Sequence, residues 1–277
     1  GWSPVLAIYA ILIGDYFQGL IPALAVIPKT FLSLLVGGFI FGSLAVINSK
    51  GLKNGARAGY VLAVVSLIPL MVITLAPFLT GDFHIANITG SWFPVDWTWD
   101  LQHVLIIFGL FAMAEWSACA WETAAIYGPE YKNPNTDTPK ALLVCGGICL
   151  VLYILVQTSV IGTLGVDQVI AQPVSPMLPL ANISLGSLGA SISIIMLIGA
   201  MLLIIQTAFL SSARSIYSMS IQGNLPAFLS KLNSHGHPMN AMAADAMFNM
   251  CLILLGNPTA ILAASAIGYM CANGISL

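Results

Sequence analysis

Long apolar runs separated by short polar turns fill the whole chain. Five stretches contain no charged residue: 30–49, 58–81, 141–166, 168–213 and 246–277. Each is long enough to cross a bilayer as an α-helix, which takes about 20 residues. None shows the alternating pattern of a membrane β-barrel strand. The pattern predicts an all-α membrane protein of about eight spans, at residues 5–27, 30–48, 58–79, 102–128, 139–164, 187–220, 240–256 and 258–277.

The composition agrees with a membrane protein. Hydrophobic residues make up 58% of the chain and charged residues 6%, whereas a soluble domain has roughly 25% charged residues. So little polar surface could not cover a globule in water, and lipid must cover part of it. The chain starts at Gly1 and stops within apolar sequence, so we expect residues 1–277 to be a single transmembrane domain cut from a longer protein.

Basic residues predict the orientation. Loops two spans apart, and therefore on one side of the membrane, contain Lys50, Lys53, Arg57, Lys132, Lys140, Arg214 and Lys231. The positive-inside rule makes that side cytoplasmic. We then expect outer loops at 80–101 and 165–186, with Lys29 facing outward. Residues 50–60 are expected to form a basic amphipathic linker at the membrane interface.

Acidic residues inside predicted spans are the candidate functional groups. Glu115 and Glu122 lie seven residues apart in the span 102–128, and so on one face of an unbroken helix. An ionised, unpaired carboxylate at that depth costs about 3 kcal/mol or more. The small residues between them permit a tight helix contact with paired carboxylates, or a local break that holds a ligand. Asp15 is a third acidic residue within a predicted span, midway along residues 5–27.

The remaining polar groups are assigned structural or surface roles. Gln157, Thr158, Gln206 and Thr207 are expected to form hydrogen bonds between helices. Asp245 is expected at the interface, and His235 and His237 in water. The five cysteines lack zinc-type spacing and nothing indicates nucleic-acid binding, so no metal or cofactor is expected.

Two motifs give the chain a family resemblance. Residues 116–141 resemble the sixth helix and following turn of the amino acid–polyamine–organocation permeases, through Trp121-Glu122-Thr123-Ala124-Ala125, Glu130-x-Lys132-Asn133-Pro134 and Pro139-Lys140-Ala141. Ala213-Arg214-Ser215-Ile216-Tyr217, followed by Gly223-x-x-Pro226, is similar to the inner end of the family's eighth helix. A weaker match runs from Asn48 to Arg57. Ala120 stands where glycine is usual, and Gln222 where Asp is usual.

The resemblance implies the five-plus-five inverted repeat transporter fold, with this chain covering helices three to ten. Spans 5–27, 30–48, 187–220 and 240–256 would then be the scaffold helices. By the resemblance, Trp116 stacks on or gates the substrate, with a lipid-facing or packing aromatic as the alternative. An unwound backbone around Ser117, Ala118, Cys119, Ala120 and Trp121 would receive the substrate's amino group. Glu122 would be a proton-sensitive or structural carboxylate beside it. Because the family's third helix lines the substrate path, the resemblance also makes Asp15 a candidate proton or cation partner, with a buried, hydrogen-bonded structural role as the alternative. The residues that would hold the inner turns are Glu130, Lys132, Asn133, Pro134, Arg214 and Tyr217.

The leading hypothesis is therefore a multi-pass protein of the cell membrane that transports an amino acid or related amine by alternating access, with proton coupling or exchange. A channel or a non-transporting sensor on the same fold remains an alternative. A membrane-embedded enzyme is disfavoured, because His103, the histidine nearest a span, lacks a convincing partner. The sequence leaves the substrate, the coupling ion and the oligomeric state open.

Overall fold

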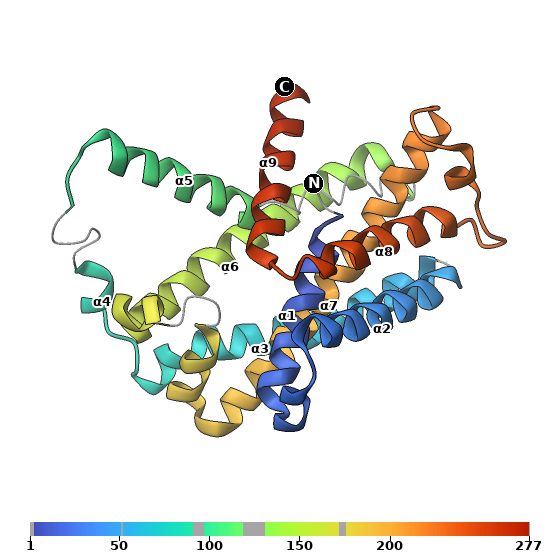
Figure 1. The fold of residues 1–277 in the computed structure, drawn as a ribbon. Helices are drawn as coiled ribbons and strands as arrows, with labels where there is room; N and C mark the ends of the chain where they lie inside the picture. Colours follow the sequence, from blue (N-terminus) through green and yellow to red (C-terminus); the bar gives the residue numbers. More distant parts are fainter. Residues whose placement is uncertain (1–2, 51, 91–96, 119–130, 172–175, 277) are drawn as a thin grey trace. The chain divides into compact units, whose positions relative to one another are not determined.

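A computed structural model of the chain describes residues 3–50, 52–90, 97–118, 131–171 and 176–276, with the backbone alone at some of these positions, including residues 115–118. All regular elements in these ranges are helices (Figure 1). They are α1 (Val5–Leu20), η1 (Pro22–Val26), α2 (Lys29–Ser49), α3 (Leu52–Thr80), α4 (Ala86–Thr89), α5 (Leu101–Ala118), α6 (Pro134–Ala171), α7 (Met177–Ile221), η3 (Ala227–Ser230), α8 (Met239–Leu254) and α9 (Pro258–Ser276).

Each predicted span overlaps an apolar helix in the described residues. Within the described residues, α2, α6, α7 and the segment Asn54–Thr80 of α3 are long and apolar enough to cross a membrane. Shorter apolar helices occupy Val5–Gln18, Leu101–Phe111, Met239–Leu254 and Pro258–Cys271. The all-α prediction is confirmed. The expected linker at 50–60 is not a separate element, because α3 already begins at Leu52.

The first predicted span is shorter than expected. Helix α1 ends at Leu20, and the chain continues through the extended residue Ile21 into the 3₁₀ turn η1. Pro22 is the reason, since a residue before proline is disfavoured in the helical region. Gln18 holds the turn, donating hydrogen bonds from Nε2 to the carbonyl oxygens of Leu24 (3.2 Å) and Ile27 (2.8 Å).

The described residues of the range 165–186, expected as an outer loop, are largely helical. The helical path of α6 is interrupted at Gly165 (φ 71°) and that of α7 at Gly186 (φ 64°), and helix lies on both sides of each break. Positive φ costs glycine little, so both breaks fall where the sequence allows them. The break at Gly165 leaves the Gly162 carbonyl to accept hydrogen bonds from His84 N (2.9 Å) and Asn87 Nδ2 (2.9 Å).

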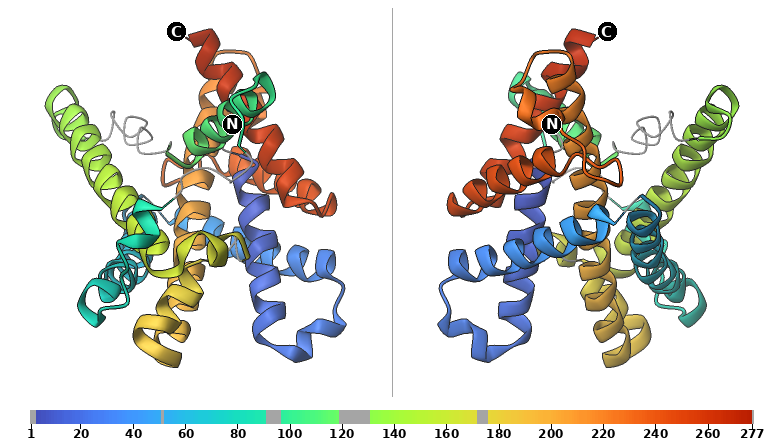
Figure 2. Two further views of the ribbon diagram at one scale, coloured as in Figure 1. Left: turned by 90° about the vertical axis from the view of Figure 1, so that its left-hand side faces the viewer. Right: turned by 90° about the vertical axis from the view of Figure 1, so that its right-hand side faces the viewer.

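The contacts divide the chain into two compact units. Unit 1 comprises Gly1–Ser66 and Leu197–Leu277, and unit 2 comprises Leu67–Met196. In unit 1, α1 packs against α2, α8 and α9, and α2 packs against α8 (Figures 1 and 2). Of the helices expected to form the scaffold, α1, α2 and α8 belong to unit 1, as does the span 187–220 from Leu197 onward; residues 187–196 belong to unit 2.

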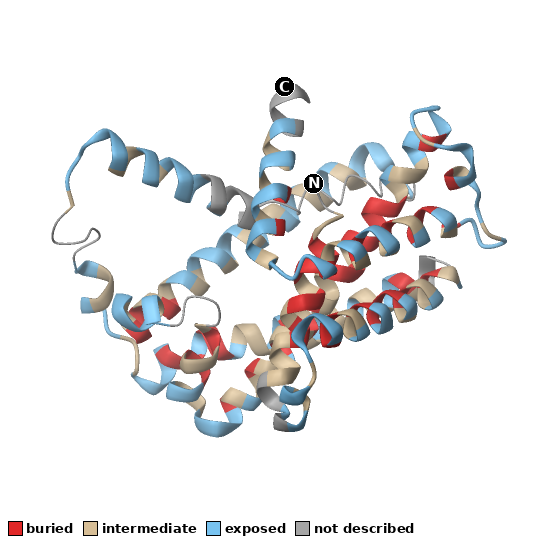
Figure 3. Cartoon of the chain, viewed as in Figure 1, coloured by how far each residue is buried: buried red, intermediate tan, exposed pale blue. Residues whose placement is uncertain are grey.

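The core of unit 1 forms where these helices face one another (Figure 3). Leu6, Ile13, Phe209 and Met242 are among its fully buried side chains. Gly37 allows α2 to approach α8 closely, because a Cβ there would lie 2.7 Å from Ile253 Cδ1. The outer faces remain apolar, with Phe39 76% exposed and Tyr60 73% exposed, as suits helices surrounded by lipid.

Candidate functional site

Helix α5 leads into the predicted substrate segment. Asp100 caps its start, accepting hydrogen bonds at Oδ1 from His103 N (2.9 Å) and at Oδ2 from Thr98 Oγ1 (2.8 Å). These bonds, chiefly that from the His103 backbone, lower the pKa of Asp100 from 3.8 to about 2. The His103 ring lies 2.8 Å from the same carboxylate and 4.5 Å from the Trp97 ring. His103 thus belongs to a helix cap.

The described backbone is helical as far as Ala118, so Glu115, Trp116, Ser117 and Ala118 all lie on α5. Their side chains lie outside the described residues. Residues 119–130 lie outside them entirely, and this range includes Cys119, Ala120, Trp121, Glu122 and Glu130. The substrate-binding and proton-coupling roles assigned to these residues remain predictions.

Asp15 lies near the end of α1 and is partly exposed. Its Oδ1 is 3.7 Å from Lys29 Nζ at the start of α2, and the two side chains are 40% and 76% exposed respectively. An exposed ion pair of this kind contributes about 0–1 kcal/mol. Lys29, the basic residue expected on the outer side, therefore has a carboxylate partner. The proton-coupling role of Asp15 remains a prediction.

The Lys132-Asn133-Pro134 turn opens a helix. Pro134 is the first residue of α6, a position where a proline loses no hydrogen bond. Asp137 Oδ2 accepts a hydrogen bond from Asn133 N (3.0 Å), and Asp137 N donates to the Asn133 carbonyl (2.8 Å). The backbone of Asn133 and the Asp137 carboxylate thus close the first turn of α6, while the structural roles of the side chains remain predictions. Arg214 and Tyr217, on α7, are both partly exposed.

A buried polar cluster joins α1, α7 and α8. Asp245, only 1% exposed, accepts hydrogen bonds from the hydroxyls of Ser3 and Ser212 and from Asn249 Nδ2 (3.3 Å). Asn249 is fully buried, and its Oδ1 accepts from Ala7 N (3.1 Å). Asp245 is thus enclosed by protein, whereas its expected place at the membrane interface remains a prediction. An acid within the apolar run 239–254 was the sequence feature that could have revealed this cluster.

A second buried cluster joins α2, α3 and α7. The Asn48 and Gln206 amides exchange two hydrogen bonds, of 3.1 and 3.0 Å, and Gln206 Nε2 also donates to the Gly55 carbonyl (3.3 Å). The interhelical role expected of Gln206 is confirmed. Thr207 instead bonds within α7, to the Leu203 carbonyl. His237 is buried, contrary to expectation, whereas His235 is exposed.

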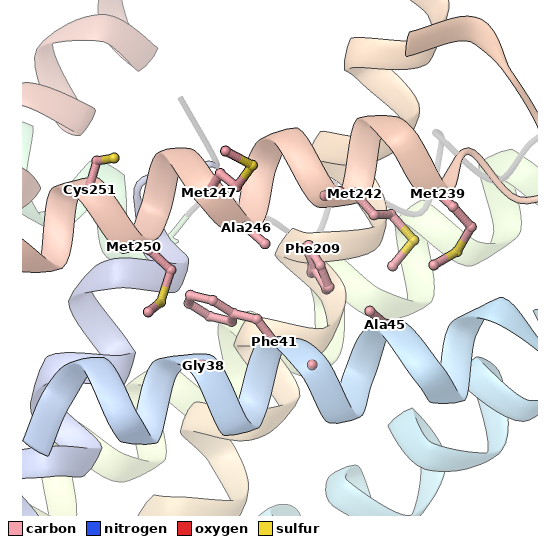
Figure 4. Close-up of a pocket in the computed structure, with 12 residues that line it drawn as sticks. Gly38, Phe41, Ala45, Phe209, Met239, Met242, Ala246, Met247, Met250 and Cys251 are labelled. Atoms are coloured by element: carbon pink, nitrogen blue, oxygen red, sulfur yellow. The ribbon is translucent and has the colours of Figure 1, made fainter. Parts of the chain in front are cut away.

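The groove in Figure 4 runs between α2 and α8, with Phe209 of α7 in its lining. Its volume is about 470 Å³, and its lining is apolar, with Phe41, Met242, Met247 and Cys251 among the residues around it. An amino acid has a charged ammonium and a charged carboxylate, and binding sites position a few polar groups for such ligands. This groove offers neither charge a partner and is unsuited to that substrate.

The helices and their apolar surfaces define a multi-pass integral membrane protein. The family model described as amino acid permease matches residues 1–277. The chain therefore belongs to the amino acid permease family.

Curated relatives include transporters from bacteria and yeast. The serine/threonine exchanger SteT of Bacillus subtilis is 26% identical over 235 residues, covering 82% of this chain and 50% of the relative. The arginine/ornithine antiporter ArcD1 of Lactococcus lactis is 24% identical, covering 77% and 43%. The histidine permease of Saccharomyces cerevisiae is 23% identical, covering 76% and 37%. The chain spans about half the length, or less, of these relatives.

Proposed function

We propose that the complete protein is a secondary transporter of an amino acid or related amine in the cell membrane. The observation that carries this proposal is the amino acid permease match along the whole chain. Two of the relatives are named as an exchanger and an antiporter, which favours exchange of one amino acid for another as the mode of transport. Exchange needs no cofactor, since the gradient of one solute drives the other.

In the proposed mechanism, the segment from Trp116 to Glu122 binds the substrate and changes its exposure, while unit 1 serves as the fixed scaffold. Trp116 stacks on the bound solute, and backbone groups released after Ala118 receive its ammonium. Two features of unit 1 support a rigid scaffold: the polar cluster around Asp245, and the Asn48–Gln206 amide pair. Buried hydrogen bonds of this kind fix helix positions.

The test starts with the purified full-length protein in detergent. Thermal shifts are measured with each amino acid and with polyamines, at acidic and neutral pH. A raised melting temperature with one chemical class identifies the substrate, and uptake of that compound into proteoliposomes preloaded with it demonstrates exchange. Uptake that never exceeds equilibration would instead indicate a channel, and binding without uptake would indicate a sensor.

Glu122 is proposed as the proton-sensitive carboxylate. A carboxyl group held in a low-dielectric site binds its proton more strongly than one in water, so it can load and release a proton near neutral pH. Glu122→Gln should flatten the pH dependence of uptake, whereas the control Glu130→Gln, in the inner turn, should preserve it. A pH profile identical to that of the wild type would remove Glu122 from the coupling mechanism.

A further inference from the structure

A second groove in unit 1 differs from that of Figure 4 in having a basic residue, Arg57, among those that line it. It runs between α2 and α3, with a volume of about 440 Å³. Phe39, Leu44 and Ile47 of α2 line one side, and Val61 and Leu62 of α3 line the other. Arg57 also lines it, on α3. A ligand with a long apolar part would fit this lining, and a negatively charged end would suit the Arg57 side chain.

Unit 1 supplies no counter-ion for Arg57. Its sequence ranges contain six basic residues and two acidic residues, Asp15 and Asp245. Asp15 pairs with Lys29, and Asp245 is enclosed by Ser3, Ser212 and Asn249. Arg57 is exposed and forms no ion pair with any described residue of the unit. Within unit 1, the charge of Arg57 is therefore not neutralised.

The groove is long enough to hold most of an acyl chain within one bilayer leaflet. The α2 residues that line it run from Phe39 to Ile47, a rise of about 12 Å along a helix. The hydrocarbon core of one leaflet is about 15 Å thick, half the thickness of the bilayer core. The distribution of basic residues puts Arg57 on the cytoplasmic side, where anionic lipids gather. A chain lying in the groove would thus place its headgroup beside Arg57.

We propose that this groove binds an anionic phospholipid of the inner leaflet, with one acyl chain between α2 and α3 and the phosphate at Arg57. The planar guanidinium donates two parallel hydrogen bonds to phosphate oxygens, which a neutral surface residue cannot do. Phe39 and Val61, which are 76% and 58% exposed, cover the acyl chain. The α2–α8 groove of Figure 4 has no cation in its lining, and an acyl chain there would show no headgroup preference.

The test is native mass spectrometry of the full-length protein. Delipidated protein is incubated with equal amounts of phosphatidylglycerol and phosphatidylcholine, and the retained lipids are identified. The wild type should retain phosphatidylglycerol preferentially. Arg57→Gln should reduce that preference roughly five-fold, the factor expected for one basic residue near an anionic lipid. Lys140→Gln, which removes an exposed cation from α6, should leave the preference unchanged.

Substitutions at two neighbouring positions on α2 distinguish the α2–α3 groove from the α2–α8 groove. Ser43 lines the α2–α3 groove and forms no hydrogen bond with a described residue, whereas Gly42 lines the α2–α8 groove and has open space where a side chain would stand. Ser43→Leu should abolish the preferential retention of phosphatidylglycerol. Gly42→Leu should leave it intact. If Ser43→Leu fails to fold, the comparison of Arg57→Gln with Lys140→Gln decides the question alone.

Three outcomes would overturn the proposal. The first is a phosphatidylglycerol preference that survives Arg57→Gln. The second is equal lipid retention by the Ser43→Leu and Gly42→Leu proteins. The third appears in the same spectra, as a dimer that dissociates in Arg57→Gln or Ser43→Leu while lipid retention stays constant. That result would assign the groove to a second copy of the chain.

Discussion

At the scale of single residues, buried amides determine how α2, α3 and α7 pair. Asn48 is 1% exposed and Gln206 2% exposed, so neither amide can turn to water if it loses its partner. An unsatisfied buried polar group costs about 1–3 kcal/mol, while removal of both partners can be nearly neutral. The pair therefore predicts strong coupling between substitutions at the two positions.

Gln206→Leu is expected to lower the free energy of unfolding by about 2 kcal/mol, because it leaves the Asn48 amide without its described partner. Asn48→Leu should act similarly, and the double variant should lose clearly less than the sum. The measurement is a double-mutant cycle on the purified full-length protein, unfolded with SDS in mixed micelles. Additive losses would mean that the two amides act independently.

Asp100 gives a pH dependence to the start of α5. Its folded pKa of about 2 lies below its ordinary value of 3.8. The ionised cap therefore stabilises the helix above pH 3.8, and this contribution is lost as the pH falls toward 2. The difference in thermal stability between wild type and Asp100→Ala should shrink across that window, with Asp167→Ala as the exposed control. A constant difference at all pH values would contradict the cap.

At the scale of elements, a glycine sets the approach of α3 to α2. A Cβ on Gly55 would overlap Asn48 Oδ1, while one on Gly59, a turn further along α3, would meet nothing within 4 Å. Gly55→Ala should lower the free energy of unfolding by about 1–3 kcal/mol. Gly59→Ala should be neutral or stabilising by up to about 1 kcal/mol, because alanine favours helix. SDS unfolding of both variants checks the difference, and equal effects would contradict it.

The positions of the spans could be predicted because lipid requires long apolar helices, and the charge-free runs show where they lie. Their ends could not be predicted as well. Pro22 ended α1 early, and Asn133-Pro134 began α6 five residues before the predicted start at 139. Apolar periodicity is insensitive to such local capping and to the left-handed glycines 165 and 186. Turn chemistry decides these boundaries.

The buried polar clusters could be predicted only in part from the sequence. A single sequence identifies Asp245 as an acid in an apolar run, but it does not show that Ser3 and Ser212 lie beside it. Those partners are 242 and 33 residues away along the chain, and the packing of α1 and α7 on α8 brings them together. The candidate substrate segment, by contrast, was found through motif resemblance, and its side-chain roles remain predictions.

At the scale of the whole molecule, the division into two units predicts which part of the protein changes conformation when substrate binds. Unit 1 is tied by the Asp245 cluster and by the Asn48–Gln206 pair, so its helices should move as one body. Segment 116–122 lies in the sequence range of unit 2 and contains the proposed binding residues. A transporter that alternates access needs one body whose internal contacts persist while the other changes its exposure.

Hydrogen exchange of the full-length protein, with and without saturating substrate, measures this division. We expect unchanged protection of backbone amides in α1, α2 and α8, and at least a several-fold change in exchange rate in segment 116–122. The buried clusters oppose opening of unit 1 in either state, whereas the proposed site gains or loses backbone hydrogen bonds as substrate binds. Asp245→Ala should reduce this difference in protection between unit 1 and segment 116–122. Because α8 would lose its hydrogen bonds to Ser3 and Ser212, its amides should exchange faster even without substrate. Substrate-dependent changes spread equally over both units would mean that unit 1 is not a fixed scaffold.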